Sequence, residues 1–279
     1  MKFSLWTKYG ARNSVPVFEA FRRSLVMNGY KYEYNCPNAD VDVIWSVLWK
    51  GRMAPNKDIF NNGKPTIVIE VGSIHRGITW RVGFNGIGRR NVFFPQGNDQ
   101  SRANALNLRL APWRTDGEYI LICCQNPNSL LWKGMPTPAE WIKDTVNKIR
   151  EVSDRHIIIR QHPRAPFRCI LPPSDNISYE KPVKIPGSYD DYDMSFKKIH
   201  ATVNCCSGPG PESIINGVPA FVGVDSLAWH VGNHSLKNIE NPYRPCRQQW
   251  LNDYAHTEFT TNEIVQGAPL HKLLKLLDK

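Results

Sequence analysis

The residues of this chain that are best suited to chemistry lie in one run, 202–222. The run predicts a buried strand, a turn that contains Gly208, a short helix with Glu212 in its first turn, and a second strand. The first N–H groups of a helix lack partners and the helix dipole favours negative charge, so Ser207 and Gly208 would face an anion such as phosphate. Taken alone, the pattern fits equally well a turn without a ligand, in which Glu212 is only solvated.

Polar side chains follow four predicted strands of the second half, at the point where each strand ends. Ligands of open α/β sheets bind beyond the carboxyl ends of the strands. Arginine can bind a diphosphate through paired hydrogen bonds, and the carboxylate of Glu212 can accept hydrogen bonds from both hydroxyls of a ribose. The groups therefore indicate a nucleotide-sugar pocket, and with Glu212 they are Gln125, Asn126, Arg160, His162, Arg164, Cys206, Ser207, Gly208, Pro209 and Asp225.

Strands that alternate with helices must position these side chains. Apolar residues at helical spacing predict a helix at 15–27, and a second helix at 137–150 has Thr137 as its cap and Glu140 at the capping-box position. Short, nearly continuous apolar runs predict strands that are buried in a parallel sheet, and this alternation is typical of the α/β class. These strands lie at 2–7, 41–49, 66–71, 119–124 and 156–160.

An irregular, arginine-rich segment, 85–114, interrupts the alternation, and the pattern restarts near Asp116. We therefore expect two Rossmann-like domains, with boundaries 1–114 and 115–255. The last segment, 256–279, is predicted to be a terminal helix that returns to the first domain.

Composition indicates a folded protein with an anionic partner. The chain has 279 residues, of which 41% are hydrophobic, so it can bury a substantial core. Thirty-five Lys and Arg residues against 25 Asp and Glu residues give a formal net charge of +10, which favours polyanions. Seven arginines are clustered in one stretch, namely Arg76, Arg81, Arg89, Arg90, Arg102, Arg109 and Arg114.

Several classes of protein are disfavoured. No apolar run approaches the ~20 residues that a membrane span needs, and the first residues lack a signal-peptide core, so we expect a cytoplasmic protein without a membrane partner. The seven cysteines include two adjacent pairs but no C-x-x-C spacing, which argues against structural zinc and a disulfide framework. No P-loop motif is present, and no obligate protein partner is indicated.

Metal signals are weak in this sequence. Asp40-x-Asp42 and Asp191-x-Asp193 imitate a D-x-D metal pair, but the first is predicted to begin a strand and the second to lie in a polar loop. We therefore expect no required divalent metal and no cofactor other than the co-substrate.

The strand followed by a Ser-Gly-x-Gly-x-Glu helix start resembles the donor-binding element of GT-B glycosyltransferases. In that fold two Rossmann-like domains face each other across a cleft, the second domain holds a nucleoside-diphosphate sugar, and a C-terminal helix returns to the first. The resemblance implies that Ser207, Gly208 and Pro209 contact the diphosphate and that Glu212 contacts the ribose. It assigns His162 and Arg164 to the base or the phosphates of a donor, which we expect to be a UDP-sugar.

Two further regions resemble phage-encoded glycosyltransferases, a group that includes enzymes acting on hydroxymethylated DNA bases. One region combines residues 70–76 with 84–88, and the other combines 250–255 with 259–267. The resemblance implies a bacteriophage enzyme of the host cytoplasm whose acceptor is a 5-hydroxymethyl pyrimidine in double-stranded DNA.

Transfer to a hydroxyl requires a base on the acceptor side, and Glu70 at the end of a predicted strand is the first candidate. Asp99 is the second candidate and His75 the third, whereas an ion pair between Glu70 and Arg76 is the structural alternative. The predicted acceptor-binding residues are Arg12, Asn13, Ser14, His75, Arg76 and Asn85.

If DNA is the acceptor, segment 76–114 is expected to hold phosphates at the mouth of the cleft, and the target base is expected to flip out of the duplex. Aromatic residues of this segment could stack on the base or pack in the core, namely Trp80, Phe84, Phe93, Phe94 and Trp113. Two other hypotheses stay open: a glycosyltransferase that acts on lipopolysaccharide, capsule or protein, and a non-catalytic basic α/β protein that binds nucleic acid.

Overall fold

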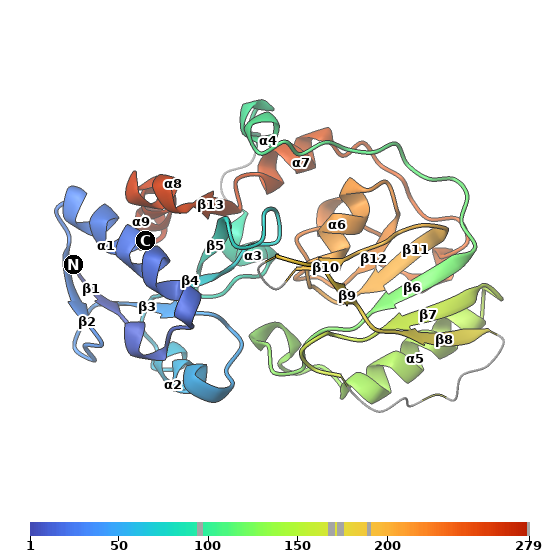
Figure 1. Cartoon of the computed structure of the whole chain (residues 1–279), viewed down its shortest axis with the longest axis horizontal. Helices are drawn as coiled ribbons and strands as arrows, with labels where there is room; N and C mark the ends of the chain where they lie inside the picture. The colour runs from blue at the N-terminus through green and yellow to red at the C-terminus, as the bar shows by residue number, and fades with distance from the viewer. Residues whose placement is uncertain (94–96, 167–170, 172–175, 189–190, 278–279) are drawn as a thin grey trace. The chain divides into compact units, whose positions relative to one another are not determined.

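The computed structural model describes residues 1–93, 97–166, 171, 176–188 and 191–277, so Phe94 lies outside the described residues. The chain forms two compact units. The first unit comprises Met1–Gln96, Asn128–Leu130 and Tyr254–Lys279, and the second comprises Gly97–Pro127 and Leu131–Asp253. Residues 97–114, which the sequence analysis assigned to the first domain, group with the second unit, whereas the C-terminal segment groups with the first (Figure 1).

A six-stranded sheet forms the centre of the first unit, in the order β13-β5-β4-β3-β1-β2. Strands β1 to β4 run parallel to one another, whereas β5 and β13 are antiparallel to their neighbours and lie at one edge. The strands are β1 (Lys2–Leu5), β2 (Lys31–Tyr34), β3 (Val41–Trp45), β4 (Thr66–Val71), β5 (Thr79–Phe84) and β13 (Glu258–Thr260).

The core of the first unit joins α1 (Val15–Met27) to the C-terminal segment. Phe21 and Leu25 lie one turn apart on the buried face of α1, and they belong to the same apolar cluster as Leu270 of the C-terminal segment. The segment forms two helices rather than one, because Gly267 adopts a positive φ of 85° between them. The other α-helices among the described residues of this unit are α2 (Asn56–Phe60), α3 (Arg89–Val92), α8 (Thr261–Val265) and α9 (Ala268–Leu277).

The second unit contains the parallel sheet that the apolar runs predict. Its five strands have the order β12-β11-β6-β7-β8, and each pair is parallel. Cys123 at the end of β6 is paired with Asn204 at the end of β11 and with Arg160 at the end of β7, so the carboxyl ends lie at one edge. The strands are β6 (Tyr119–Cys123), β7 (His156–Arg160), β8 (Ile177–Glu180), β11 (Ile199–Asn204) and β12 (Ala220–Val222).

Helices α5 (Pro138–Arg150) and α6 (Pro209–Ile215) cover opposite faces of this sheet (Figure 1). The predicted capping box of α5 is confirmed, because the Glu140 N–H donates to Thr137 Oγ1 at 3.2 Å and the Thr137 N–H donates to Glu140 Oε2 at 2.9 Å. Two further helices are α4 (Ser101–Ala105) and α7 (Gln248–Tyr254).

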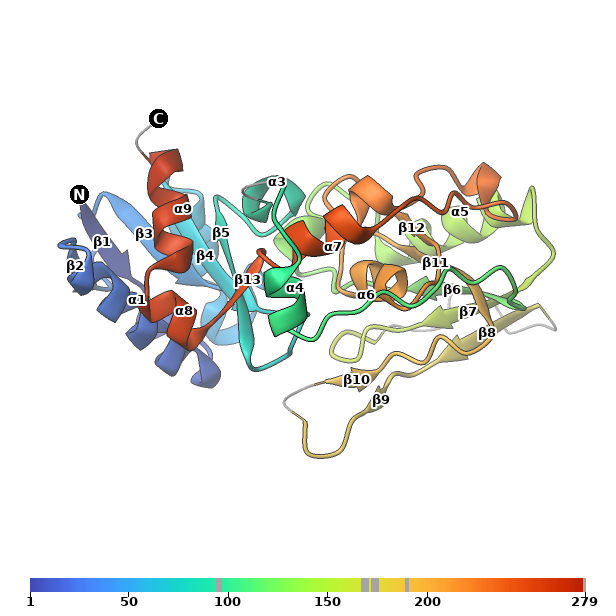
Figure 2. The ribbon, with the colours of Figure 1, turned by 90° about the horizontal axis from the view of Figure 1, so that it is seen from above.

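A small hairpin separates β8 from β11 along the chain. It consists of β9 (Val183–Lys184) and β10 (Tyr192–Asp193), which pair antiparallel with each other. The hairpin stands apart from the five-stranded sheet (Figure 2). The fold as a whole is therefore mixed α/β, with a parallel sheet at the centre of the second unit.

Candidate active site

The carboxyl edge of the sheet in the second unit gathers the side chains that the sequence analysis predicted for the donor. Gln125 follows β6, Arg160 ends β7, and Ser207 follows β11 immediately before α6. These three strands are neighbours in the sheet, in the order β11-β6-β7. Parallel pairing thus brings together groups that are far apart in the sequence, at the edge where α/β sheets bind ligands.

Gln125 and Cys206 connect two of these strand ends. The backbone N–H of Cys206 donates to Gln125 Oε1 at 3.1 Å, and its thiol lies 3.2 Å from the same oxygen. Both side chains are buried, and a hydrogen bond with the Cys205 thiol, together with burial, raises the pKa of Cys206. The Cys206 side chain therefore supports the turn as a neutral thiol, and the predicted phosphate contact rests with its neighbours, Ser207 and Gly208.

Hydrogen bonds tie the start of α6 to β11. Asn204 Nδ2 donates to Ser207 Oγ at 2.8 Å and to the carbonyl oxygen of Cys123 at 3.2 Å. A Cβ atom at Gly210 would lie 3.3 Å from Asn204 Oδ1 and 3.2 Å from Val222 Cγ1, which leaves little room for a side chain. The close approach of helix and strand favours glycine here, and it orients the turn of Ser207 toward the carboxyl edge.

Glu212 lies in the first turn of α6 and is partly buried. Burial raises the pKa of Glu212 to about 8, with a further increase from the negative charge of Asp191, while Arg160 acts in the opposite direction. The side chain is therefore mostly protonated at neutral pH. A neutral carboxyl group can both donate and accept a hydrogen bond, and it does not repel an anion at the start of the helix.

Arg160 is buried at the same edge but already has partners within the protein. Its Nη2 atom lies 3.2 Å from both carboxylate oxygens of Glu180 and donates to the carbonyl oxygen of Ser195 at 3.2 Å, and Nη1 contacts the sulfur of Met194 at 3.4 Å. Arg160 Nε is buried and has no acceptor among the described residues. The paired contact of Arg160 with a diphosphate would thus require the guanidinium to leave Glu180.

His162 and Arg164 lie in the loop that follows β7. The Arg164 N–H donates to His162 Nδ1 at 3.1 Å, which orders a tight local turn. His162 is partly buried and Arg164 is exposed, so both side chains are accessible from solvent at the carboxyl edge.

Glu70 lies near the end of β4 in the first unit, where it bridges to the end of β3. Ser46 Oγ donates to Glu70 Oε2 at 2.6 Å, and the N–H of Val47 donates to the same oxygen at 3.3 Å. The N–H of Val71 donates to Oε1 at 2.9 Å. These three contacts are sufficient to hold the carboxylate at the carboxyl edge of the sheet, without the ion pair to Arg76 that was the structural alternative.

Arg12, Asn13 and Ser14 are predicted acceptor residues that follow β1 and lie at this edge, but only some of them are accessible. Arg12 is exposed and Asn13 is partly buried. Ser14 is buried, and its hydroxyl donates to the carbonyl oxygen of Ala11 at 2.6 Å. The hydroxyl of Ser14 therefore stabilises the turn before α1 and does not face a ligand.

The other predicted acceptor residues separate into two groups. His75 and Arg76 lie in the loop after β4, at the same edge as Glu70. Asn85 lies at the opposite edge, because its side chain accepts from the N–H of Thr66 at 2.9 Å, at the beginning of β4. The structure thus does not bring Asn85 together with Glu70.

Asp99, the second candidate for the base, belongs to the second unit. Its Oδ1 atom accepts a hydrogen bond from the N–H of Ser101 at 2.9 Å, at the start of α4.

Two of the aromatic residues that were considered for stacking on a base already pack within the protein. Trp80 packs on Trp45 in the core, with ring centroids 5.6 Å apart. The guanidinium of Arg247 lies 3.7 Å from the centroid of the Trp113 ring.

Sequence reasoning missed Glu258, which is fully buried in the first unit. It accepts hydrogen bonds from the N–H of Ser73 at 2.7 Å and of Ile74 at 2.9 Å, from Thr79 Oγ1 at 2.8 Å, and from Arg81 Nη2 at 2.9 Å. Burial alone would raise the pKa of Glu258, but Arg81 and these hydrogen bonds outweigh it and lower the pKa. The sequence carries little signal for this role, because Glu258 stands in a short polar run around Phe259 that no apolar pattern marks as a strand.

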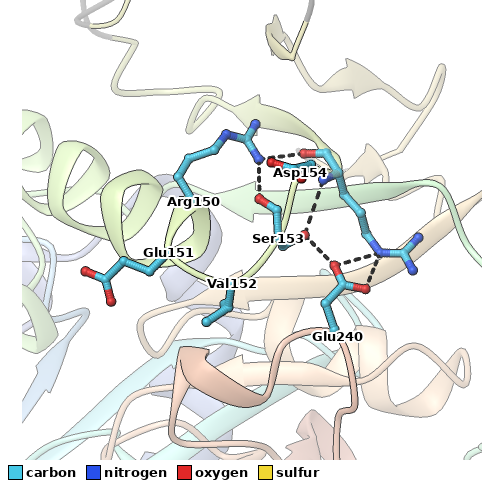
Figure 3. A pocket seen from close by; sticks show the side chains of 7 residues that line it. Arg150, Glu151, Val152, Ser153, Asp154 and Glu240 are labelled. Carbon is cyan, nitrogen blue, oxygen red and sulfur yellow. Dashed lines mark hydrogen bonds and ion pairs between the residues drawn. The ribbon is translucent and has the colours of Figure 1, made fainter.

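Two cavities of the second unit differ in their relation to the carboxyl edge. One, of about 520 Å³, is lined by Arg150, Ser153, Arg155 and Glu240 at the turn before β7, at the amino edge of the sheet (Figure 3). The other, of about 180 Å³, is lined by residues of α5 and by Cys205 and Gly223, which follow β11 and β12. Of these two, the smaller cavity adjoins the predicted donor site.

Within the described ranges, no three His, Cys, Asp or Glu side chains gather in a way that would hold a metal ion. Over the same residues, no helix combines the length and the hydropathy that a membrane span requires.

Solved structures, but not sequences, relate this chain to known proteins. No protein-family model and no curated protein sequence matches it. Its fold is similar to that of two solved structures of KpsC from Thermosulfurimonas dismutans. The β-Kdo 2,7-transferase matches with a TM-score of 0.52 and 13% sequence identity. The β-Kdo 2,4-transferase matches with a TM-score of 0.53 and 12% sequence identity. The first alignment covers 98% of this chain and 100% of the other, and the second covers 96% and 98%. The fold of this chain is therefore the α/β fold of GT-B-type glycosyltransferases, as the sequence resemblance implied.

Proposed function

We propose that this protein is a glycosyltransferase that moves a sugar from a UDP-sugar to a 5-hydroxymethyl pyrimidine in double-stranded DNA, in the cytoplasm of a phage-infected cell. The observation that carries the proposal is the gathering of Gln125, Ser207 and Glu212 at the carboxyl edge of the second sheet. It occurs in a chain whose fold matches two sugar transferases over nearly its whole length.

The start of α6 is the proposed donor site. Ser207, Gly208 and Pro209 form the turn that would contact the diphosphate, and Asn204 holds this turn through the 2.8 Å hydrogen bond to Ser207. Glu212, one turn into the helix, would bind the ribose hydroxyls. With a pKa of about 8, its carboxyl group adds little negative charge beside a diphosphate at neutral pH.

In the proposed reaction the oxygen of the acceptor hydroxyl attacks the anomeric carbon of the sugar. The bond between this carbon and the diphosphate oxygen breaks, the diphosphate leaves with the electron pair, and the hydroxyl proton passes to Glu70. Ser46 and Val47 orient the Glu70 carboxylate through Oε2, at 2.6 and 3.3 Å. Arg164 and the turn amides are the groups proposed to stabilise the departing diphosphate.

The DNA acceptor is supported by the formal net charge of +10 and by the resemblance of segments 70–76 and 259–267 to phage enzymes. A second candidate acceptor is an acidic glycan, and one observation favours it: both matched structures are Kdo transferases. Kdo is an acidic sugar, so a basic surface would serve that acceptor as well.

One experiment separates the two acceptors. The protein is incubated with a panel of nucleotide sugars and, in separate reactions, with DNA that contains 5-hydroxymethylcytosine or with an acidic capsule oligosaccharide. The nucleosides, the oligosaccharide and the nucleotide products are analysed by mass spectrometry. We expect one hexose-sized mass increase on the modified nucleoside, and we expect Glu212→Ala to lose it. Transfer to an acidic capsule oligosaccharide but not to DNA would reject the DNA acceptor, and no cleavage of any nucleotide sugar would reject the enzymatic function.

A further inference from the structure

Four cationic side chains lie on two neighbouring loops at the carboxyl edge of the first sheet. Lys8 and Arg12 lie in the loop after β1, within the short helices Thr7–Tyr9 and Arg12–Ser14, and Lys50 and Arg52 lie in the loop after β3. All four are exposed. Because β1 and β3 are adjacent and parallel, both loops leave the same edge, and Arg52 Nε donates to the carbonyl oxygen of Lys8 at 2.9 Å. We call these four residues the basic edge.

Ion pairs within the described part of the chain do not neutralise the basic edge, although the Glu70 carboxylate lies at the same edge of the sheet, bonded to Ser46. None of its four side chains forms an ion pair with a carboxylate of the described residues. By contrast, some cations elsewhere on the first unit are paired, such as Lys2 with Glu33 at 3.1 Å. The helices α1 and α2 that follow the two loops carry one carboxylate each: Glu19, which is paired with Arg22, and the exposed Asp58. Unpaired like charges that are held on one edge attract an anionic ligand.

Aromatic rings and unsatisfied donors accompany the cations. The rings of Trp6 and Tyr9 stack with centroids 6.1 Å apart, and Lys8 Nζ lies 5.7 Å from the Tyr9 ring. Asn13 Nδ2 and Trp49 Nε1 are buried donors that have no acceptor in the described part of the chain. A buried donor without an acceptor is unfavourable, so an acceptor that reached either atom on binding would be favoured.

Two arginines of the segment 76–114 are engaged by contacts within the protein. Arg81 is buried against Glu258, and Arg114 Nη1 donates to the carbonyl oxygen of Phe196. The segment is also divided, since residues up to Gln96 belong to the first unit and those from Gly97 to the second. These two arginines are therefore not available to a phosphate, whereas the four cations of the basic edge are exposed and belong to one unit.

We propose that the basic edge binds the phosphodiester backbone of duplex DNA. Arginine and lysine neutralise phosphates, and the arginine fork matches two phosphate oxygens. The inference rests on the proposed function, because it names the surface that holds the DNA on either side of the acceptor hydroxyl.

The test is the salt dependence of binding to a fluorescent duplex that contains 5-hydroxymethylcytosine, measured by anisotropy. The variant K8Q/K50Q/R52Q removes three of the four cations. Each lost phosphate contact lowers the slope of log K against log salt by about 0.9, so we expect a loss of nearly 3 in slope. An unchanged slope would overturn the proposal.

Two matched variants serve as controls. R23Q/K31Q/K275Q removes the same charge from exposed positions of the first unit outside the basic edge, and we expect the wild-type slope to change little. K8R/K50R/R52K retains the charge and should retain binding. An equal loss in the first control variant would mean that net charge alone attracts DNA, and would also overturn the proposal.

Competition and UDP binding distinguish the remaining outcomes. We expect polygalacturonate, an acidic glycan, to compete poorly with the duplex; equal competition at equal charge would assign the basic edge to glycans instead of DNA. UDP binding, measured by calorimetry, should be unaffected in K8Q/K50Q/R52Q. A wild-type protein that binds the duplex through the basic edge but transfers no sugar would reject the proposed function and leave this inference intact.

Discussion

Glu258 Oε1 lies 2.9 Å from Arg81 Nη2, and the carboxylate is completely buried. This ion pair joins β13, near the end of the chain, to β5. The same carboxylate accepts hydrogen bonds from the N–H groups of Ser73 and Ile74, which lie in the loop after β4. Gly72 packs so closely on it that a Cβ there would lie 2.3 Å from Glu258 Oε2. One carboxylate thus orders the loop that follows Glu70.

We expect Glu258→Ala to destabilise the protein by about 3–5 kcal/mol, because it leaves the buried guanidinium of Arg81 without its ionic partner and with only the hydrogen bond to Ser73 Oγ. The lowered pKa of Glu258 means that its stabilising effect is present above the pKa of the unfolded chain and is lost as the pH falls through the lower, folded value. Urea unfolding at neutral and acidic pH measures both effects. Glu19→Gln, which breaks the exposed pair with Arg22, is the control and should change stability little.

The raised pKa of Glu212 predicts a pH-dependent donor affinity. Above pH 8 the carboxyl group ionises, and repulsion of the diphosphate by the new charge outweighs its stronger hydrogen bonds to ribose, so UDP affinity should fall. Glu212→Gln should bind UDP with little change over this range, whereas Glu212→Ala should bind weakly throughout. Calorimetry from about pH 6 to about 9 measures the trend; an affinity of wild type that rises with pH would contradict it.

The same shift affects folding with a definite sign. Because burial raises the pKa of Glu212 from its ordinary value of 4.5 to about 8 in the folded protein, the stabilising effect of the protonated form is complete below pH 4.5 and is lost as the pH rises to 8. Glu212→Gln should therefore gain stability relative to wild type over this interval, by up to ~5 kcal/mol before solvent screening, which reduces it. Urea unfolding of both proteins across the interval measures the difference, and parallel stability curves would count against it.

Glu70→Gln tests the proposed base. The amide can still accept the hydrogen bonds from Ser46 and Val47 but cannot take a proton, so we expect transfer to fall by about 10²-fold or more while UDP binding is retained. Asp99→Asn and His75→Gln should retain transfer. Turnover near that of wild type in Glu70→Gln would move the base to one of these two residues.

Gln125→Ala tests the contact between the ends of β6 and β11. It leaves the buried N–H of Cys206 without its acceptor, which costs about 1–3 kcal/mol. We expect a lower melting temperature and weaker UDP binding, because the Ser207 turn loses its support. Gln266→Ala, at an exposed position of the first unit, is the control; if Gln125→Ala behaves like it, Gln125 does not support the turn.

Local sequence patterns predicted the elements whose signals are complete within a few residues. The capping box at Thr137 and Glu140 was sufficient for α5, and the apolar runs were sufficient for β4 and β7, because these signals report burial and hydrogen bonding along one short segment. The strand ends that carry Gln125, Arg160 and Ser207 were also predictable, since parallel strands share a carboxyl edge.

The tertiary structure alone decided which distant residues meet. Antiparallel pairing of β13 with β5 brings Glu258 to Arg81 across 177 positions, and the turn of Asn85 places that residue at the edge opposite Glu70. The arginine-rich segment is one cluster in the sequence but is shared between two units, whereas Lys8 and Arg52 become neighbours. Strand order and direction determine such contacts, and they depend on long-range packing that no local pattern specifies.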